Sequence, residues 1–182
     1  IEDYSEVISL KDAPPYQIAK ALIYRGVVYG GIGETDKKIE DYSAVITFQD
    51  ASTDQIAKAQ FNRGVVYGDL GETDKAIEDY SAVITLKDAP TDQIAKALVN
   101  RGVVYGDLGK TDKEIEDYSA VITLKDAPTE QVAKALFNRG LVYLLLKETN
   151  KAIEDYSAVI SLEGASKGIV MRALFQSAEL HI

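Results

Sequence analysis

The sequence repeats itself every 38 residues. The pentapeptide Ile-Glu-Asp-Tyr-Ser occurs five times at this spacing, and it starts at Ile1, Ile39, Ile77, Ile115 and Ile153. A fixed period of this length is the signature of a solenoid, in which repeated units stack on one another. Because each unit is too short to bury its own apolar face, it packs only on its neighbours. We therefore expect a stacked array with an extended surface, and such surfaces usually hold other proteins.

The repeat frame divides the chain into consecutive units of one array. We expect a partial repeat at 1–14, full repeats at 15–52, 53–90, 91–128 and 129–166, and a C-terminal half repeat at 167–182. The chain has no initiator methionine and no signal-like segment, and Ile1 enters in the middle of a repeat. We therefore expect a fragment of a longer protein.

The composition excludes several classes of partner. Hydrophobic residues make up 46% and charged residues 27% of the chain, and no apolar run approaches the ~20 residues of a membrane span, so we expect a soluble chain. A formal net charge of -9 makes the whole chain a poor match for nucleic acid or anionic lipid. The absence of cysteine excludes disulfides and thiolate metal sites. It leaves the compartment open, with the cytoplasm favoured.

Each period contains two helical patterns. In the third full repeat, Asp92 to Leu108 has apolar or small residues spaced by three and four, and Gly109 offers a stop to this first helix, helix A. Thr111 can then cap a second helix, helix B, which continues until the segment 126–128 breaks it. Because the gaps are only a few residues long, adjacent helices should be antiparallel neighbours in an all-α fold.

These residues resemble a known family, the tetratricopeptide repeat. The positions that match its small, aromatic and aliphatic signature are Leu98, Gly102, Tyr105, Gly109, Ile115, Tyr118, Val121 and Leu124. The match covers essentially the whole chain and recurs four times, although the period is four residues longer than usual and Arg101 and Glu114 replace a common leucine and alanine. The resemblance implies a right-handed α-α superhelix of antiparallel helix pairs, with the A helices on the inner, concave wall and the B helices outside.

The resemblance also implies that a partner binds along the A helices. The groove stripe, as we name the matching positions, consists of Lys58, Phe61, Asn62 and Val65, then Lys96, Val99, Asn100 and Val103, then Lys134, Phe137, Asn138 and Leu141. Lysine offers three donors and asparagine offers both donors and acceptors, so together they can hold a carboxylate, an acidic side chain or an extended backbone. A different reading also stays open, in which the lysines form a solvated face and Phe61, Phe137 and Phe175 are core packing.

The fourth full repeat departs from the pattern. Leu144 and Leu145 replace the Gly-Asp pairs of the two repeats before it, and Arg172 follows at the lysine position of the half repeat. We predict an apolar hot spot here within a polar rim, for a peptide or helix with bulky apolar residues and neighbouring acidic groups. The alternative is that these leucines only seal the array against the half repeat.

Arginine and aspartate recur at a fixed offset of sixteen residues. The four pairs are Arg25 with Asp41, Arg63 with Asp79, Arg101 with Asp117, and Arg139 with Asp155. This offset joins helix A to helix B of one repeat, so we predict bidentate ion pairs with a structural role. Nine of the eleven tyrosines also fall on repeat-frame positions and are expected in the core. Tyr16 and Tyr24 lie off the frame, and Tyr24 takes the asparagine position of the groove stripe.

The sequence contains no convincing catalytic motif. Gly109-Lys110-Thr111 resembles the end of a phosphate loop but lacks its first glycine and the preceding strand. The single histidine, His181, has no cysteine or second histidine with which to hold a transition metal. We therefore predict no enzyme, no cofactor and no metal, but a scaffold that binds a partner protein. The alternatives are a structural solenoid that forms homo-oligomers through its open ends, or the regulatory repeat region of a larger enzyme.

Overall fold

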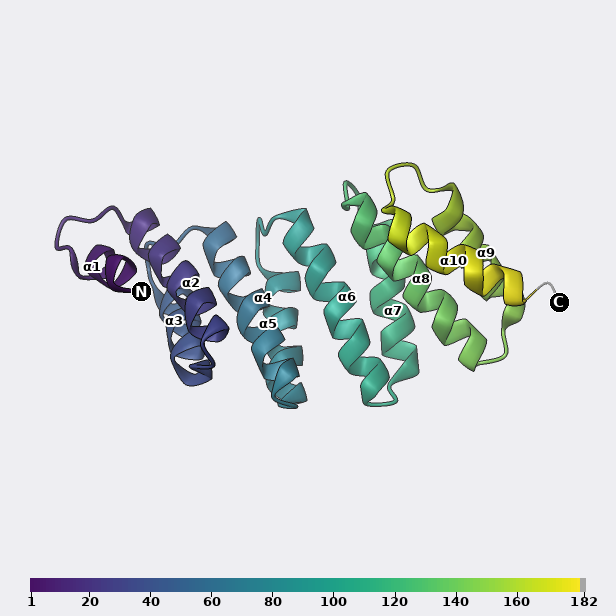
Figure 1. Cartoon of the computed structure of the whole chain (residues 1–182), viewed down its shortest axis with the longest axis horizontal. Coiled ribbons are helices and arrows are strands. Elements are labelled where there is room, and N and C mark those ends of the chain that lie inside the picture. Colours follow the sequence, from purple (N-terminus) through teal and green to yellow (C-terminus); the bar gives the residue numbers. More distant parts are fainter. Residues whose placement is uncertain (181–182) are drawn as a thin grey trace. The chain divides into compact units, whose positions relative to one another are not determined.

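The computed structural model describes residues 1–180, and these residues form ten helices and no strand (Figure 1). The helices are α1 (Glu2–Ser9), α2 (Pro15–Gly31), α3 (Thr35–Thr47), α4 (Thr53–Asp69), α5 (Thr73–Thr85), α6 (Thr91–Asp107), α7 (Thr111–Thr123), α8 (Thr129–Leu145), α9 (Thr149–Ser161) and α10 (Lys167–Glu179). The all-α prediction is therefore confirmed. The prediction for His181 concerns a residue outside the described range.

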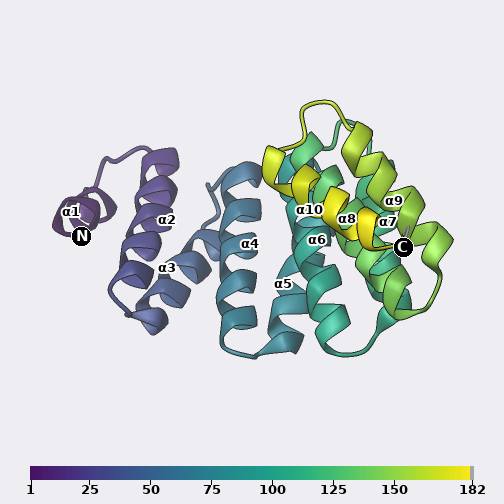
Figure 2. The ribbon, with the colours of Figure 1, turned by 45° about the vertical axis from the view of Figure 1, so that its right-hand side comes forward.

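Every full repeat holds the same two helices. Helix A has 17 residues in α2, α4, α6 and α8, and helix B has 13 residues in α3, α5, α7 and α9. The helices fall into two compact units, residues 1–93 and residues 94–182, with the boundary inside α6. In the first unit α2 packs on α3, α3 on α4 and α4 on α5, and Figures 1 and 2 both show α2 beside α3 and α4 beside α5. In the second unit α7 packs on α8, α8 on α9 and α9 on α10.

Consecutive A helices also contact each other within each unit. α2 contacts α4 in the first unit, and α8 contacts α10 in the second. Side chains on one face of these helices can therefore meet across a repeat boundary. This arrangement is what positions the candidate sites described below.

In every full repeat a glycine of helix A lies close against a tyrosine of helix B. A Cβ on Gly64 would lie 2.9 Å from Cε1 of Tyr80, and a Cβ on Gly140 would lie 2.7 Å from Cε1 of Tyr156. The same contact recurs between Gly26 and Tyr42 and between Gly102 and Tyr118. These four tyrosines are buried, so the ring cannot move aside. Helix A therefore needs a residue without a side chain at this point, although glycine lowers its helix propensity.

The tyrosines on helix A are less buried than the sequence predicts. Tyr67 lies half-buried between Arg63, whose guanidinium carbon is 5.8 Å from the ring centre, and Lys75, whose Nζ is 5.0 Å from it. Tyr29, Tyr105 and Tyr143 have the same two kinds of neighbour. An aromatic ring attracts cations to its faces, so these tyrosines join the core to the charged surface.

Two details of the predicted helix ends were wrong. Thr111 lies inside α7 rather than at its N-cap; the cap is Lys110, which makes no side-chain capping bond. Gly109 with a φ of 66° turns the chain there, and the carbonyl of Lys110 then accepts the first helical bonds, so the helix already begins at Thr111. At the other end, Leu124 adopts an extended conformation and closes α7 before the segment 126–128.

We predict opposite effects for two glycine substitutions one turn apart on α4. Gly64→Ala places a methyl group against the buried Tyr80 ring and should destabilise the fold by about 1–3 kcal/mol through overpacking. Gly68→Ala meets no atom within 4 Å and should be neutral or stabilising by up to about 1 kcal/mol, because alanine favours the helix. Denaturant unfolding of both variants measures the difference. Equal destabilisation would contradict the close approach at Gly64.

Candidate functional site

The structure places the groove stripe on the A helices but buries two of its members. On α8, Lys134 is exposed, Asn138 and Leu141 are half-buried, and Phe137 is only 3% exposed. On α6, Val99 is buried while Val103 is exposed; Lys96 and Asn100 are half-buried. On α4, Lys58 is exposed and Phe61, Asn62 and Val65 are half-buried.

Phe137 belongs to the core of the second unit. Its ring lies 5.6 Å from that of Tyr156, and both pack with Ile169 and Ala173 of α10. The ring of Phe61 packs on Tyr80 in the same way, at 5.9 Å. Most of the surface of the Phe61 and Phe137 rings is therefore covered by packing inside the protein, and only the remainder could contact a partner.

The asparagines of the stripe have partners inside the protein. The side chain of Asn62 hydrogen-bonds the hydroxyl of Tyr42 in the preceding repeat, and Asn138 does the same to Tyr118. Burial raises the pKa of Tyr42 to about 12, and the Asp41 carboxylate adds to this rise, while the bond from Asn62 opposes it. Asn62 therefore gives the buried hydroxyl of Tyr42 a polar partner, whereas the hydroxyl of Tyr118 also donates to Glu114 at 3.4 Å.

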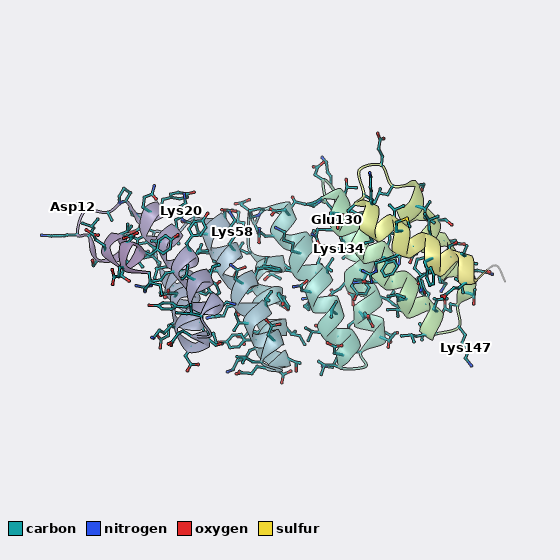
Figure 3. All side chains as sticks on the ribbon, viewed as in Figure 1. Asp12, Lys20, Lys58, Glu130, Lys134 and Lys147 are labelled. Carbon is teal, nitrogen blue, oxygen red and sulfur yellow. The ribbon has the colours of Figure 1, made fainter. Side chains whose placement is uncertain are left out.

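The stripe lysines of α4 and α8 face carboxylates on their own helices. Lys58 Nζ lies 2.8 Å from an oxygen of Asp54, and this hydrogen bond raises the pKa of Lys58. Lys134 Nζ lies 4.0 Å from Oε1 of Glu130, one turn away on α8. Figure 3 labels both residues. Glu130 also accepts hydrogen bonds from the backbone N–H and the hydroxyl of Ser166, at 3.2 and 3.3 Å. A lysine whose charge is balanced by a carboxylate one turn away attracts an acidic partner less strongly than an unpaired lysine does.

Arg172 differs from these lysines. Four residues before it stands Gly168 instead of an acidic residue, and within residues 1–180 no carboxylate lies within ion-pair distance of its guanidinium. The guanidinium lies 4.3 Å from the ring centre of Phe137 instead. The half repeat thus presents a cation that lies beside an aromatic ring and has no carboxylate of residues 1–180 near it.

A pocket of about 370 Å³ opens beside Arg172. We name it the α8–α10 pocket, and its lining consists of Phe137, Leu141, Met171, Arg172, Phe175 and Gln176. Met171 is 66% and Phe175 is 65% exposed. Sequence reasoning missed Met171 and Gln176 as lining residues. The signal was available, because Met171 stands where all four complete A helices have a buried alanine.

Leu144 and Leu145, which the sequence analysis placed in an apolar hot spot, do not line this pocket. Leu144 is half-buried against the core of the second unit, whereas Leu145 is 84% exposed and does not line the pocket. Lys134 and Asn138 do not line it either. The structure brings together Phe137, Leu141 and Arg172 from the predicted set.

The four arginine–aspartate pairs form bidentate contacts in every full repeat. In each pair Nε donates to one aspartate oxygen at 2.8 or 2.9 Å and Nη2 donates to the other at 2.7 Å. These hydrogen bonds raise the pKa of each arginine. The four aspartates are buried, which explains why each needs a strong partner.

The same arginines reach the preceding repeat, which the sequence analysis did not predict. Nη1 of Arg139 donates to the hydroxyl of Ser119 at 2.8 Å, and Arg63 does the same to Ser43. Arg25 donates to Ser5 at 2.9 Å. The serine is the last residue of the repeated pentapeptide, twenty residues before the arginine. That second fixed offset was the available signal.

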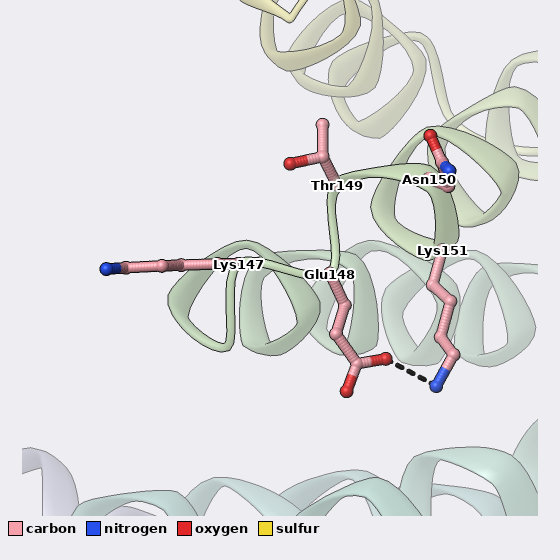
Figure 4. A pocket seen from close by; sticks show the side chains of 5 residues that line it. All are labelled: Lys147, Glu148, Thr149, Asn150 and Lys151. Carbon is pink, nitrogen blue, oxygen red and sulfur yellow. Dashed lines mark ion pairs between the residues drawn. The ribbon is translucent and has the colours of Figure 1, made fainter.

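Another hollow lies at the turn between α8 and α9 (Figure 4). Its volume is about 340 Å³, and its lining is the continuous segment Lys147 to Lys151. Lys151 pairs with Glu148, while Lys147 points away from that pair. The hollow has no apolar floor, so we assign it no ligand.

Within residues 1–180, no group of three or more acidic, histidine or cysteine side chains is placed to hold a metal ion. No helix of the same residues has the length and apolar character that a membrane span requires.

Sequence comparison matches one family. A model described as tetratricopeptide repeat matches residues 57–88 and 133–164, and a second model with the same description matches residues 95–128. Together these ranges cover more than half of the chain. No curated protein sequence matches the chain.

The fold is similar to those of several solved structures. The crystal structure of MamA is 22% identical, with a TM-score of 0.67 over 98% of this chain and 88% of that one. BtubC from P. vanneervenii is 16% identical, with a TM-score of 0.72 over 99% of this chain and 71% of that one. A tetratricopeptide repeat protein from Parabacteroides merdae is 20% identical, with a TM-score of 0.68 over 90% of this chain and 64% of that one. At these identities the likeness concerns the fold alone.

We predict that two buried tyrosines respond differently to loss of the hydroxyl group. Tyr42→Phe removes the bond with Asn62 and should destabilise the fold by about 0.5–1.5 kcal/mol. The buried hydroxyl of Tyr156 has no hydrogen-bond partner within residues 1–180, so Tyr156→Phe should be neutral or stabilising. Chemical denaturation of both variants decides the point. A larger loss for Tyr156→Phe than for Tyr42→Phe would contradict the role given to Asn62.

Proposed function

The chain belongs to the tetratricopeptide repeat family, and we propose that it is a scaffold that binds a segment of a partner protein at the α8–α10 pocket. The proposal rests on the surroundings of Arg172. Within residues 1–180 no carboxylate lies beside its guanidinium, and exposed apolar side chains line the pocket next to it. Sites that combine a desolvated apolar centre with a charged rim tend to concentrate binding energy. We propose no catalytic role.

The pocket favours a particular partner chemistry. Met171 and Phe175 offer exposed apolar area, and a thioether side chain adapts its shape to the group that it contacts. The planar guanidinium of Arg172 can bind both oxygens of a carboxylate, and it is less strongly hydrated than a lysine ammonium. A peptide with a bulky apolar residue next to an acidic residue fits both features.

The lysines of the stripe support the same choice of site. Lys58 and Lys134 already face Asp54 and Glu130, so an incoming carboxylate must compete with a carboxylate one turn away. Arg172 presents no such competition from the described residues. We therefore place the partner's acidic group at the half repeat and not along the whole lysine ladder.

The alternative of stacking copies through α10 is less well supported. In α2, α4, α6 and α8 an Arg-Gly pair receives helix B of the same repeat, with the arginine on its aspartate and the glycine on its tyrosine. At the corresponding positions α10 has Ser177 and Ala178. A helix B packed there in the same way would lose the ion pair and meet a Cβ, which disfavours such an assembly.

We predict that the charge of Arg172 decides binding. The probe is a fluorescent peptide in which a phenylalanine precedes two glutamates, and its affinity is measured by anisotropy. Arg172→Glu should weaken binding roughly tenfold or more, because it replaces attraction by repulsion in a partly desolvated pocket. The melting temperature should change little, since Arg172 is exposed.

Lys134→Glu is the matched control for this experiment. It makes the same change of charge on an exposed position of the neighbouring helix, but outside the pocket. We expect a smaller loss from it. Equal losses from both variants would show that only net charge matters, and no loss from Arg172→Glu would contradict the proposed site.

A further inference from the structure

The first full repeat carries a side-chain pattern found on no other A helix of the chain. On α4 three positions spaced by four residues hold an acid, a cation and an amide, namely Asp54, Lys58 and Asn62. On α2 the same three positions hold Tyr16, Lys20 and Tyr24. Tyr16 is 54% and Tyr24 is 48% exposed. One turn of helix separates each tyrosine from the lysine, so all three lie on one face.

Because Tyr16 stands where α4 has Asp54, Lys20 has no acidic residue one turn before it. Lys58 is held by Asp54 at 2.8 Å, whereas within residues 1–180 no carboxylate lies within ion-pair distance of Lys20. Its Nζ lies 6.0 Å from the ring centre of Tyr24. Repeat one therefore presents a lysine without a carboxylate between two exposed aromatic rings.

Tyr24 also lacks the internal role of the asparagine that it replaces. Asn62 hydrogen-bonds a buried tyrosine hydroxyl of the preceding repeat. Tyr24 instead stacks on Tyr4, with ring centres 6.2 Å apart and planes at 15°. Almost half of its surface remains exposed in that stacked position, so its ring is oriented and accessible at once.

A small hollow lies between these side chains and α4. We name it the tyrosine hollow, and its lining consists of Tyr16, Lys20, Ile23, Tyr24, Asp54, Gln55 and Lys58. Figure 3 labels two of these residues, Lys20 on α2 and Lys58 on α4. Its volume is about 80 Å³, far below the 300–1,000 Å³ of sites for drug-sized ligands. It can accept one compact ring or a short side chain.

A hydrogen bond of Gln55 links the helices that line the hollow. The side-chain amide of Gln55 donates to the backbone carbonyl of Tyr16 at 2.8 Å, and its oxygen accepts from the backbone N–H of Ser52 at 3.1 Å. Gln55 is buried, so these bonds tie α4 to the first turn of α2. The spacing between the two walls is therefore fixed before any ligand arrives.

We propose that the tyrosine hollow binds an extended, proline-containing acidic segment of another protein. This site is in the first unit and is separate from the α8–α10 pocket. An amphipathic helix binds through a row of apolar side chains, and a hollow of about 80 Å³ is too small to accept them. A β-strand would need free backbone groups, but the walls are α-helices whose amides bond within the helix.

The polyproline II conformation suits a small hollow whose walls offer no free backbone groups. It needs no hydrogen bonds from its binding surface, its rings pack on aromatic faces, and it loses little entropy on binding. Tyr16 and Tyr24 are eight residues apart on α2, which corresponds to about 12 Å along the helix. At about 3.1 Å per residue, a polyproline II segment spans this in roughly four residues. A glutamate between two prolines would then reach Lys20.

The test uses a fluorescein-labelled peptide with the core Pro-Pro-Glu-Pro-Pro, titrated with the whole chain and followed by anisotropy. We expect saturable binding that weakens with salt. Tyr16→Ala should reduce the affinity by roughly fivefold or more, and Tyr16→Phe should restore most of it, because the ring face carries the contact. Lys20→Glu should reduce the affinity roughly tenfold and reverse the salt dependence, because salt then screens a repulsion between two carboxylates.

Peptide variants and the second unit supply the controls. Replacing the prolines by alanine, or the glutamate by glutamine, should each weaken binding. Arg172→Glu should leave binding of this peptide unchanged, which separates it from the function proposed above. Equal binding of the alanine peptide, or full affinity after Tyr16→Ala, would overturn the proposal. Concentration-dependent dimers that Tyr16→Ala dissolves would overturn it as well, since a second copy would then be the occupant.

Discussion

The guanidinium of the repeated arginine is the contact on which the helix arrangement depends. Through Nε and Nη2 it holds the buried aspartate of helix B in its own repeat, and through Nη1 it holds a serine of the preceding helix B. One side chain on helix A thus fixes two neighbouring helices. An unpaired carboxylate at this depth would be costly, so the arginine cannot be lost without consequence for its aspartate.

This contact explains why the pentapeptide Ile-Glu-Asp-Tyr-Ser recurs. Its aspartate binds the arginine of the same repeat, its tyrosine packs against the glycine that follows that arginine, and its serine binds the arginine of the next repeat. The repetition therefore records how helices pack. The two binding sites that we propose lie where the repeats differ, at Tyr16 and Tyr24 on α2 and at Met171 and Arg172 on α10.

Much of the fold could be predicted from the sequence, because its determinants are local and repeated. Helix A was predicted at residues 92–108 and observed at Thr91–Asp107, and the sixteen-residue offset predicted the partner of each arginine. The candidate site was harder to predict. A three- and four-residue spacing tells which side chains share a face, but it cannot tell that Phe137 turns into the core. The difference in charge between the cation positions could have been predicted from the residue four positions before each, which is Asp54, Glu130 or Gly168. The distances add that Asp54 and Glu130 do face their lysines.

The most direct test is a double-mutant cycle across a repeat boundary, with Arg139→Ala, Ser119→Ala and the double variant compared by denaturant unfolding. The account predicts a coupling energy of about 0.5–1.5 kcal/mol between the two side chains, since they share a hydrogen bond of 2.8 Å. The control is Ser161→Ala, whose hydroxyl bonds only within its own helix, and this change should add to Arg139→Ala without coupling. Additive effects of Arg139→Ala and Ser119→Ala would contradict the claim that the arginine joins one repeat to the next.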